Sequence, residues 1–225
     1  MSTDGIKKAV AACAADLVQD GMIVGLGSGS TSAYCIISLI ERCRNGLHIQ
    51  AVASSTNSAQ LAQKGGIPLL DYNQVKEVDL TLDGADEVNP EKEMIKGRGG
   101  ALLREKILAE MSKKCVIMVD ETKLVHKLGI AKLPVEIVPF GISATVKRLG
   151  GLGYKGTWRI NQNGSLFITD NANYIFDIEF EEPRENPKED HKLISSIAGV
   201  VETGFFFNLA TSVIIGFSDG QIITR

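Results

Sequence analysis

Two short stretches of the chain carry side chains suited to acid–base chemistry on a phosphorylated ligand. In Gly27-Ser28-Gly29-Ser30-Thr31-Ser32, glycines allow close backbone approach, and hydroxyls together with the N–H groups of a helix start can bind a phosphate. In Asp83-Gly84-Ala85-Asp86, two carboxylates lie close enough to alter each other's affinity for protons. The alternatives are a Gly/Ser turn that caps a helix and an Asp-Gly surface turn.

A third stretch combines backbone donors with charge. The glycines of Lys96-Gly97-Arg98-Gly99-Gly100 let N–H groups approach a ligand oxygen, and Lys96 adds a positive charge. On the predicted helix that follows, Glu105 shares an arc with four apolar residues: Ala101, Leu102, Leu108 and Ala109. A partly desolvated carboxylate there is a stronger proton acceptor. The alternative is an ion pair at a helix packing surface.

The remaining acids of this region lack such a placement. Glu87, Glu91, Glu93 and Glu110 are therefore expected to be solvated. A fourth fragment, "VDETK", follows another predicted strand, and its Lys123 could supply a further positive charge to an anionic ligand.

Alternating strands and helices must position these segments. Apolar runs predict strands over "MIVGLG", "HIQAVA", "IPLL", "VDLTLDG" and "KCVIMVD". Helices are predicted from an N-cap at Asp4, over residues 33–40, within "SSTNSAQLAQKGG" and over "GALLREKILAEM". Such alternation requires crossover connections and predicts a mostly parallel sheet with helices on both faces. Ligands of these sheets bind outside the carboxyl ends of the strands, where the polar segments fall.

After about residue 130 the pattern changes to a smaller α+β domain. Strands are predicted over "LPVEIVP", "YKGTWRI", "SLFITD" and "NYIFDIEF", with turns at Asn163-Gly164 and around Asn171. Helices are predicted over "ISATVKRLG" and from Pro187, with Asn186 as N-cap. The final "TSVIIGFSDGQIITR" can rejoin the first sheet. We therefore expect a larger domain of residues 1–130 and 206–225 and an inserted domain of residues 131–205.

Composition argues against several classes of protein. With 24 Lys+Arg against 27 Asp+Glu, the net charge is -3, and no basic stripe suggests a nucleic-acid partner. No segment reaches the roughly 18 apolar residues of a membrane helix, and the N-terminus lacks a secretory pattern, so we expect a cytoplasmic protein with no membrane partner. The four cysteines lack metal-site spacing and are expected to be reduced core residues.

The candidate residues match the needs of proton transfer next to a sugar carbonyl. An enediolate intermediate requires a base at carbon, a proton shuttle between neighbouring oxygens and positive charge near the oxyanion. This chemistry needs neither a redox cofactor nor a metal, and none is expected.

Seven motifs, in order and at similar spacing, closely resemble the A-type ribose-5-phosphate isomerase family. They are "GLGSGSTS", "DGADEVN", "KGRGGALLREK", "VDETK", "LPVEIVPF", "TDNANYIFD" and "GVVETGFF", and they span nearly the whole chain. Within them, Arg98 interrupts a run usually written with glycines, and Ala172 replaces a common glycine. The resemblance implies a Rossmann-like α/β domain with a smaller α+β domain, assembled as a homodimer or homotetramer.

The resemblance also implies an activity and residue roles. The enzyme would interconvert D-ribose 5-phosphate and D-ribulose 5-phosphate in the pentose phosphate pathway, without a metal. Glu105 would move a proton between C2 and C1, Asp83 would assist ring opening and the oxygen-to-oxygen transfer, and Asp86 would support that step. Lys96 and the N–H groups of Gly97, Arg98 and Gly99 would stabilise the enediolate. Ser28, Gly29, Ser30 and Thr31, with Lys123 and Lys7, would hold the substrate and its phosphate, beside Gly84 and Ala85.

Two other classes compete with this interpretation. A non-catalytic sugar-phosphate sensor would keep the phosphate loop but has no need of a desolvated glutamate. An acyl- or CoA-transferring enzyme of similar architecture would use a glutamate as nucleophile and would need a pocket for a long cofactor.

Overall fold

The chain divides into two structural units. The structure, a computed structural model, describes all residues from Met1 to Arg225. The first unit comprises Met1–Ala85, Arg104–Leu124 and Asn208–Arg225, and the second comprises Asp86–Leu103 and Val125–Phe207. This division differs from the sequence-based expectation mainly because residues 86–103 group with the inserted segment. No helix combines the length and the apolar character that crossing a bilayer would demand.

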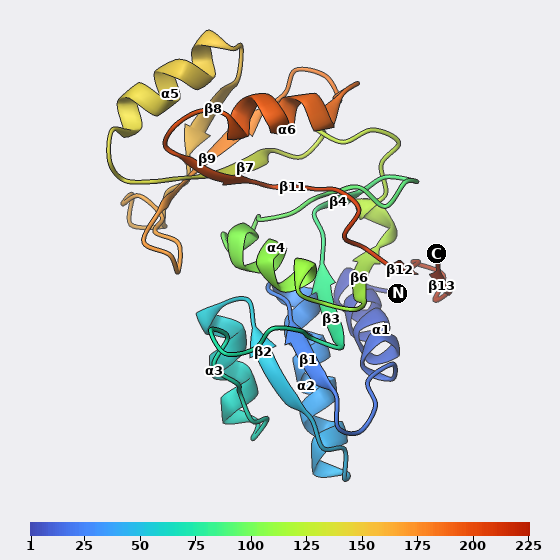
Figure 1. The fold of residues 1–225 in the computed structure, drawn as a ribbon. Helices are drawn as coiled ribbons and strands as arrows, with labels where there is room; N and C mark the ends of the chain where they lie inside the picture. Colours follow the sequence, from blue (N-terminus) through green and yellow to red (C-terminus); the bar gives the residue numbers. More distant parts are fainter. The chain divides into compact units, whose positions relative to one another are not determined.

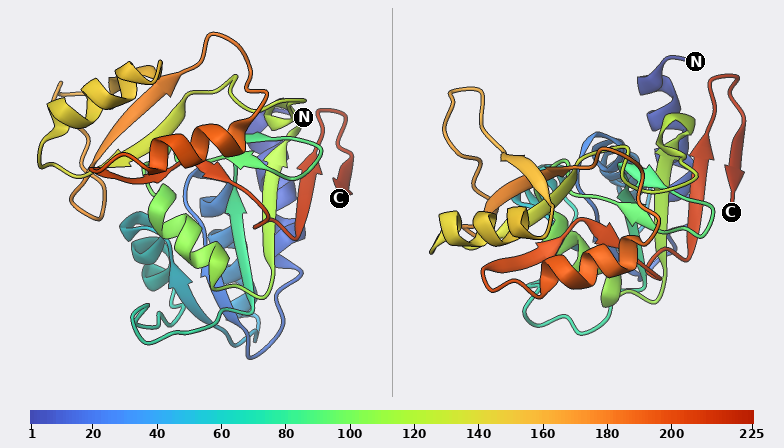
Figure 2. Two further views of the ribbon diagram at one scale, coloured as in Figure 1. Left: turned by 45° about the horizontal axis from the view of Figure 1, so that its top comes forward. Right: turned by 90° about the horizontal axis from the view of Figure 1, so that it is seen from above.

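A six-stranded sheet in the order β13-β12-β6-β3-β1-β2 forms the centre of the first unit (Figure 1). The five strands β2, β1, β3, β6 and β12 run parallel to one another, and β13 is antiparallel to β12, which confirms the predicted α/β class and the return of the C-terminal strands. Figure 2 shows β12 and β13 as a hairpin at the sheet edge. The strands are β1 (Ile23–Leu26), β2 (Gln50–Ala53), β3 (Leu80–Gly84), β6 (Cys115–Asp120), β12 (Ser212–Gly216) and β13 (Ile222–Thr224).

Helices cover both faces of this sheet. α1 (Thr3–Ala15) and α2 (Ser30–Arg44) bury their apolar sides in one cluster with alternate strand residues such as Leu26 and Leu82. Leu108 of α4 (Leu102–Glu110) packs instead with Val52 on the opposite face. Since successive strand residues point to opposite faces, the near-continuous burial of β1, β3 and β6 follows from this double cover.

Two predictions for the first unit need correction. The N-cap of α1 is Ser2, whose hydroxyl accepts a hydrogen bond from Gly5 N, so Asp4 lies inside the first turn. "IPLL" forms no strand of the sheet and contributes only an isolated bridge between Leu69 and Ala51. α3 (Thr56–Lys64) confirms the short helix predicted before it.

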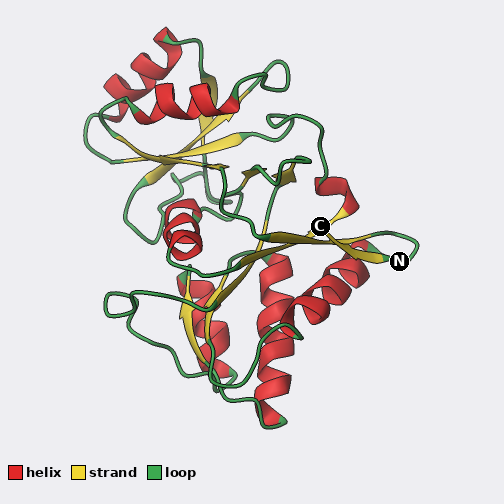
Figure 3. Ribbon diagram, turned by 45° about the vertical axis from the view of Figure 1, so that its right-hand side comes forward, coloured by secondary structure: helices red, strands yellow, loops and turns green.

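The second unit contains a four-stranded antiparallel sheet in the order β10-β7-β9-β8. Two helices, α5 (Ile142–Gly151) and α6 (Pro187–Ser195), pack on it through a core that includes Leu149, Ile194 and Val135. Figure 3 shows both helices beside this sheet. Asn186 occupies the predicted N-cap position of α6, although its side chain makes no capping hydrogen bond. The strands are β7 (Leu133–Ile137), β8 (Lys155–Trp158), β9 (Tyr174–Glu179) and β10 (Val200–Thr203).

A small three-stranded sheet, β11-β5-β4, also belongs to the second unit. It joins β4 (Glu87–Val88) and β5 (Met94–Ile95) to β11 (Phe205–Phe206) in antiparallel pairs. The expectation that Glu87 is solvated is therefore wrong: its buried carboxylate accepts hydrogen bonds from Gly129 N at 2.7 Å and from Ala131 N. Glu93 is also largely covered and pairs with Lys188.

The hairpin of residues 159–174 lacks the strand predicted over "SLFITD". Only isolated bridges join Ile160 to Leu166 and Ile168 to Tyr174. In the second turn of this segment, between Ile168 and Tyr174, Ala172 has φ 61°, a left-handed conformation that glycine adopts without steric cost. The substitution of alanine at this position therefore places local strain in the turn.

Candidate active site

Four parallel strands bring most of the predicted residues of the first unit to one edge of the sheet. β1, β2, β3 and β6 pair in parallel register, so their carboxyl ends lie on the same side. The loop of residues 27–32 follows β1, Ser54 follows β2, Asp83 and Gly84 end β3, and Asp120 ends β6. The topology thus confirms that these segments meet where ligands of such sheets bind.

The loop after β1 has the features of an anion-binding site. Gly29, with φ 89°, is the N-cap of α2 and offers no side-chain cap, so the first N–H groups of the helix stay open to a ligand. Lys7 of α1 donates from Nζ to Ser30 Oγ at 3.0 Å, which brings a positive charge to the same loop. Ser28 Oγ contacts Ser54 Oγ at 2.8 Å and is fixed from β2.

Asp83 is fixed by hydrogen bonds at the end of β3. Asp83 is only 2% exposed. Its Oδ1 accepts hydrogen bonds from Ser28 N at 3.1 Å, Ser32 Oγ at 3.2 Å and Gly84 N at 2.7 Å. Gly27 is required beside it, because a Cβ at that position would stand 2.0 Å from Asp83 Oδ1. Loop and carboxylate therefore form one rigid arrangement.

The charge of Asp83 affects a neighbouring thiol. Burial raises the pKa of Cys35 on α2 to about 12, and the Asp83 carboxylate adds to the shift. Cys35 stays a neutral thiol at physiological pH, as expected for a reduced core cysteine. The Cys35 thiol therefore adds no second negative charge near Asp83.

Glu105 lies on the buried side of α4. It is 5% exposed, and Leu108, one turn later, packs so closely on the sheet that a Cβ at Gly25 would be 3.1 Å from its Cγ. Glu110 on the far side is exposed, which confirms the predicted arc. Lys106, the next residue of the helix, is buried as well.

The remaining predicted residues belong to the second unit. Lys96 is 3% exposed; its N–H donates to Gly204 O at 2.9 Å, and its Nζ lies 5.4 Å from the centroid of the Phe206 ring. Asp86 Oδ2 accepts from Arg98 N at 2.9 Å, so this carboxylate holds the glycine-rich loop. The Arg98 side chain is exposed, and only its backbone takes part.

The structure thus brings the predicted residues together in two groups. Lys7, Ser28, Gly29, Ser30, Thr31, Asp83, Gly84, Ala85 and Glu105 belong to the first unit, with Lys123 in the 3-10 helix η1 (Glu121–Lys123) at the end of β6. Asp86, Lys96, Gly97, Arg98 and Gly99 belong to the second. The Lys123 side chain makes no hydrogen bond to the loop of residues 27–32.

Sequence reasoning placed Ser32 in the loop after the first strand, but it gave neither Ser32 nor Ser54 a supporting role in the site. Ser32 donates to Asp83, and Ser54 bonds both Ser28 and the carbonyl of Leu26. Both are small hydroxyl residues at a strand end or helix start, so their position was a usable signal.

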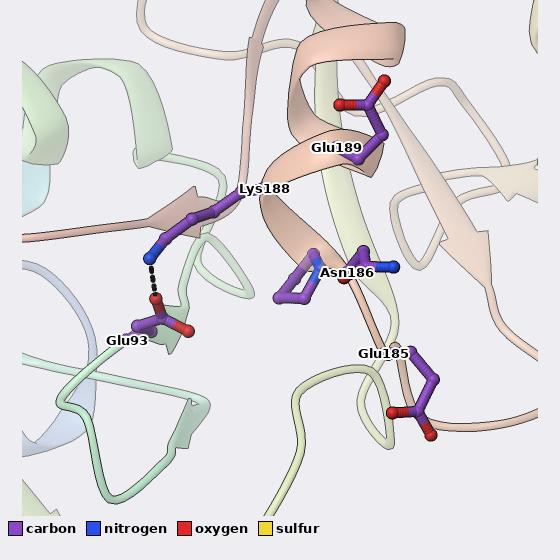
Figure 4. A pocket seen from close by; sticks show the side chains of 6 residues that line it. Glu93, Glu185, Asn186, Lys188 and Glu189 are labelled. Atoms are coloured by element: carbon purple, nitrogen blue, oxygen red, sulfur yellow. Dashed lines mark ion pairs between the residues drawn. The ribbon is translucent and has the colours of Figure 1, made fainter.

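Two hollows elsewhere have no link to the predicted residues. One, of about 570 Å³, lies at the start of α6, and three of its six lining residues are acids: Glu93, Glu185 and Glu189 (Figure 4). Lys188 reaches across to pair with Glu93 there, while Glu185 and Glu189 face solvent. The other, of about 540 Å³, lies at the amino ends of the sheet strands, beside Met22, Lys114 and Ser212. The amino-end position sets this second hollow apart from the predicted site.

The fold and the first group define a class of protein. An open, mostly parallel sheet carries a loop suited to anion binding and an aspartate fixed by hydrogen bonds, and a helix packed on the sheet carries a buried glutamate. This combination is expected of an α/β enzyme that transfers protons on an anionic substrate.

Comparisons with known proteins identify the family. The model of the family ribose 5-phosphate isomerase A (phosphoriboisomerase A) matches residues 50–220. A ribose-5-phosphate isomerase A of Protochlamydia amoebophila (strain UWE25) is 54% identical over 215 residues, covering 96% of this chain and 93% of the relative. One of Oceanobacillus iheyensis is 48% identical over 221 residues, covering 98% of each.

Solved structures of ribose-5-phosphate isomerases are similar to this chain over nearly its whole length. The ribose 5-phosphate isomerase from Plasmodium falciparum superposes with a TM-score of 0.95 at 37% identity, covering 99% of this chain and 98% of that one. A D-ribose-5-phosphate isomerase in complex with phospho-erythronic acid gives a TM-score of 0.95 at 35% identity, covering 100% and 99%. The chain belongs to the ribose 5-phosphate isomerase A family and is an aldose–ketose isomerase.

Proposed function

We propose that this chain interconverts D-ribose 5-phosphate and D-ribulose 5-phosphate through an enediolate, in the non-oxidative branch of the pentose phosphate pathway. The reaction moves one proton from C2 to C1 of the sugar and another from the oxygen on C2 to the oxygen on C1. Two features of the first unit carry the proposal: Glu105 is buried on the helix α4, and Asp83 is fixed by hydrogen bonds at the end of β3.

Glu105 is the base that removes the C2 proton and returns it to C1. Its burial excludes water, which otherwise competes for the carboxylate, and its place on a helix fixes its approach to the substrate. Asp83 assists ring opening and carries the proton between the two oxygens. Asp86, which also holds the glycine-rich loop, supports that step.

Positive charge and backbone donors stabilise the enediolate. The buried Lys96 supplies the charge, and N–H groups of the loop Gly97–Gly99 supply donors. The residues Ser28–Thr31, at the start of α2, bind the phosphate. Lys7, which donates a hydrogen bond to Ser30, and Lys123 add positive charge. No metal or cofactor takes part in these steps.

The bound ligand of one relative supports this assignment. Phospho-erythronic acid has a carboxylate whose two oxygens resemble those of the enediolate, and we expect this chain to bind it as well. Such binding would draw on both the oxyanion donors and the phosphate loop.

Glu105→Gln tests the proposal. Glutamine keeps the size of the side chain but cannot accept a proton, so kcat should fall by about 10³-fold or more while phospho-erythronic acid affinity changes little. Glu110→Gln, on the exposed side of the same helix, is the matched control and should keep normal kcat. Near-normal turnover by Glu105→Gln would show that the base is another group.

The competing classes are less well supported. A sugar-phosphate sensor has no use for the buried Glu105, and membership of the isomerase family does not favour it. Assembly as a homodimer or homotetramer and a cytoplasmic location stay predictions. Analytical ultracentrifugation of the purified chain tests the first.

A further inference from the structure

Arg159 holds the glycine-rich loop of the second unit from outside the predicted site. It follows β8 directly, and its Nη1 donates to the carbonyl oxygens of Gly97 at 2.8 Å and of Arg98 at 2.9 Å. A guanidinium presents several donors in a rigid plane, so one side chain can bind two successive carbonyls.

Arg159 is itself anchored by Asp177 of β9. Its Nε donates to Asp177 Oδ2 at 3.0 Å and its Nη2 lies 2.5 Å from Oδ1, a bidentate pair with side chains 16% and 13% exposed. Bidentate pairs of this kind fix orientation as well as charge. The sheet of the second unit therefore sets where the guanidinium lies.

Fixing these two carbonyls also fixes the N–H groups of the loop. In a trans peptide the C=O and the next N–H point in opposite directions. With Gly97 O turned to Arg159, Arg98 N–H points the other way and donates to Asp86 Oδ2 at 2.9 Å. By the same geometry, the Arg98 carbonyl orients Gly99 N–H, which makes no hydrogen bond within the chain.

A second contact restrains the end of the same loop. Gly100 has φ 82°, and a Cβ there would be 2.4 Å from the Phe167 ring, on which Arg159 also lies at 5.8 Å. Gly100 N closes a turn onto Gly97 O at 2.9 Å. The loop is thus held at both ends by the hairpin that contains Arg159 and Phe167.

We propose that Arg159, oriented by Asp177, is a positioning residue for isomerisation. It binds the carbonyls of the loop so that Arg98 N–H meets Asp86 and Gly99 N–H is presented to the developing oxyanion. Its charge also polarises both peptides, which makes their N–H groups better donors. The inference rests on the proposed role of the loop in stabilising the enediolate.

The test compares kcat, KM and local hydrogen exchange in Arg159 variants. Arg159→Ala should lower kcat roughly 100-fold, the usual effect of losing one oxyanion donor, and leave KM within about threefold. Arg159→Lys keeps the positive charge but lacks the planar set of donors of a guanidinium, so its kcat should fall roughly tenfold. Amide exchange should rise in the peptide over residues 96–101 and stay unchanged elsewhere.

A second variant separates positioning from stability. Arg159→Ala leaves Asp177 without its partner, so the double variant Arg159→Met with Asp177→Asn removes both charges. It should recover thermal stability but keep the low kcat. Recovery of kcat together with stability, or a kcat of Arg159→Ala within threefold of normal, would overturn the proposal.

Two further variants serve as controls. Arg148→Ala, an exposed arginine of α5, should behave as the unmodified chain. Lys96→Met distinguishes the two possible failures. If it is nearly inactive while Arg159→Ala is normal, only the positioning role is wrong. If Lys96→Met is itself normal, the proposed role of the loop is wrong.

Discussion

Asp83→Asn separates the structural role of Asp83 from its chemical role. Oδ1 of Asp83 accepts three hydrogen bonds, from Ser28 N, Ser32 Oγ and Gly84 N. Asparagine has a carbonyl oxygen that can occupy the same place and accept the same three bonds. Its amide replaces the second carboxylate oxygen and cannot take up a proton. The variant should therefore fold normally and lose catalysis.

The expected magnitudes can be worked out from these contacts. A hydrogen bond to an ionised acceptor is worth about 1 kcal/mol more than one to a neutral acceptor, so three bonds lose about 3 kcal/mol. Removing a charge from a site only 2% exposed offsets much of that loss, and stability should change by no more than about 2 kcal/mol. Loss of proton transfer should lower kcat about 10² to 10⁴-fold.

The assay measures ketose formation and thermal unfolding on the same preparation. Ser32→Ala is the matched control, because it removes one donor to Asp83 and leaves the carboxylate. Its kcat should fall by less than about tenfold. If Asp83→Asn is folded and turns over within tenfold of normal, Asp83 does not carry a proton and the reasoning is refuted.

Two further predictions concern stability. Ala172→Gly should raise the free energy of unfolding by about 0.5–1 kcal/mol, because φ 61° strains alanine but not glycine; a lower denaturation midpoint would contradict this. Asp79→Asn should lower stability at pH 7 by about 0.5–1 kcal/mol, and urea titrations from pH 7 to pH 2 should show the gap closing. The hydrogen bond from Lys113 and that from Ile23 N lower the pKa of Asp79 below 3.8, so its contribution is present above that pH and is lost as the pH falls. If the difference in stability between Asp79→Asn and the unmodified chain persisted at pH 2, the charge of Asp79 would not be its cause.

Local periodicity sufficed to predict the parts of the site that depend on a single element. The burial of Glu105 followed from its place on the apolar arc of a helix with 3.6 residues per turn. The meeting of the loop after β1 with Asp83 followed from parallel strand pairing, which places carboxyl ends at one edge. Both inferences used only neighbours in the sequence and one topological rule.

Contacts between distant segments could not be predicted in this way. Glu87 looked like one more acid in a charged run, yet its partners are N–H groups 42 and 44 positions away. Arg159 read as the end of a strand, and its link to the loop spans 62 positions. A carboxylate or guanidinium carries no local sign of whether a distant backbone will satisfy it.

Competition between similar residues explains the smaller differences. Ser2 and Asp4 can both cap a helix, and only the geometry shows that Ser2 Oγ reaches Gly5 N. "SLFITD" alternates like a strand, but it pairs only through two isolated bridges. Pattern alone does not rank such alternatives.

Isomerisation in heavy water tests the central claim most directly. With ribose 5-phosphate as substrate, the unmodified chain should deliver a proton that has exchanged with solvent, so ribulose 5-phosphate should carry deuterium at C1. Glu105→Gln should abolish this incorporation together with turnover. Product free of deuterium, or incorporation at the normal rate by Glu105→Gln, would contradict proton transfer by Glu105.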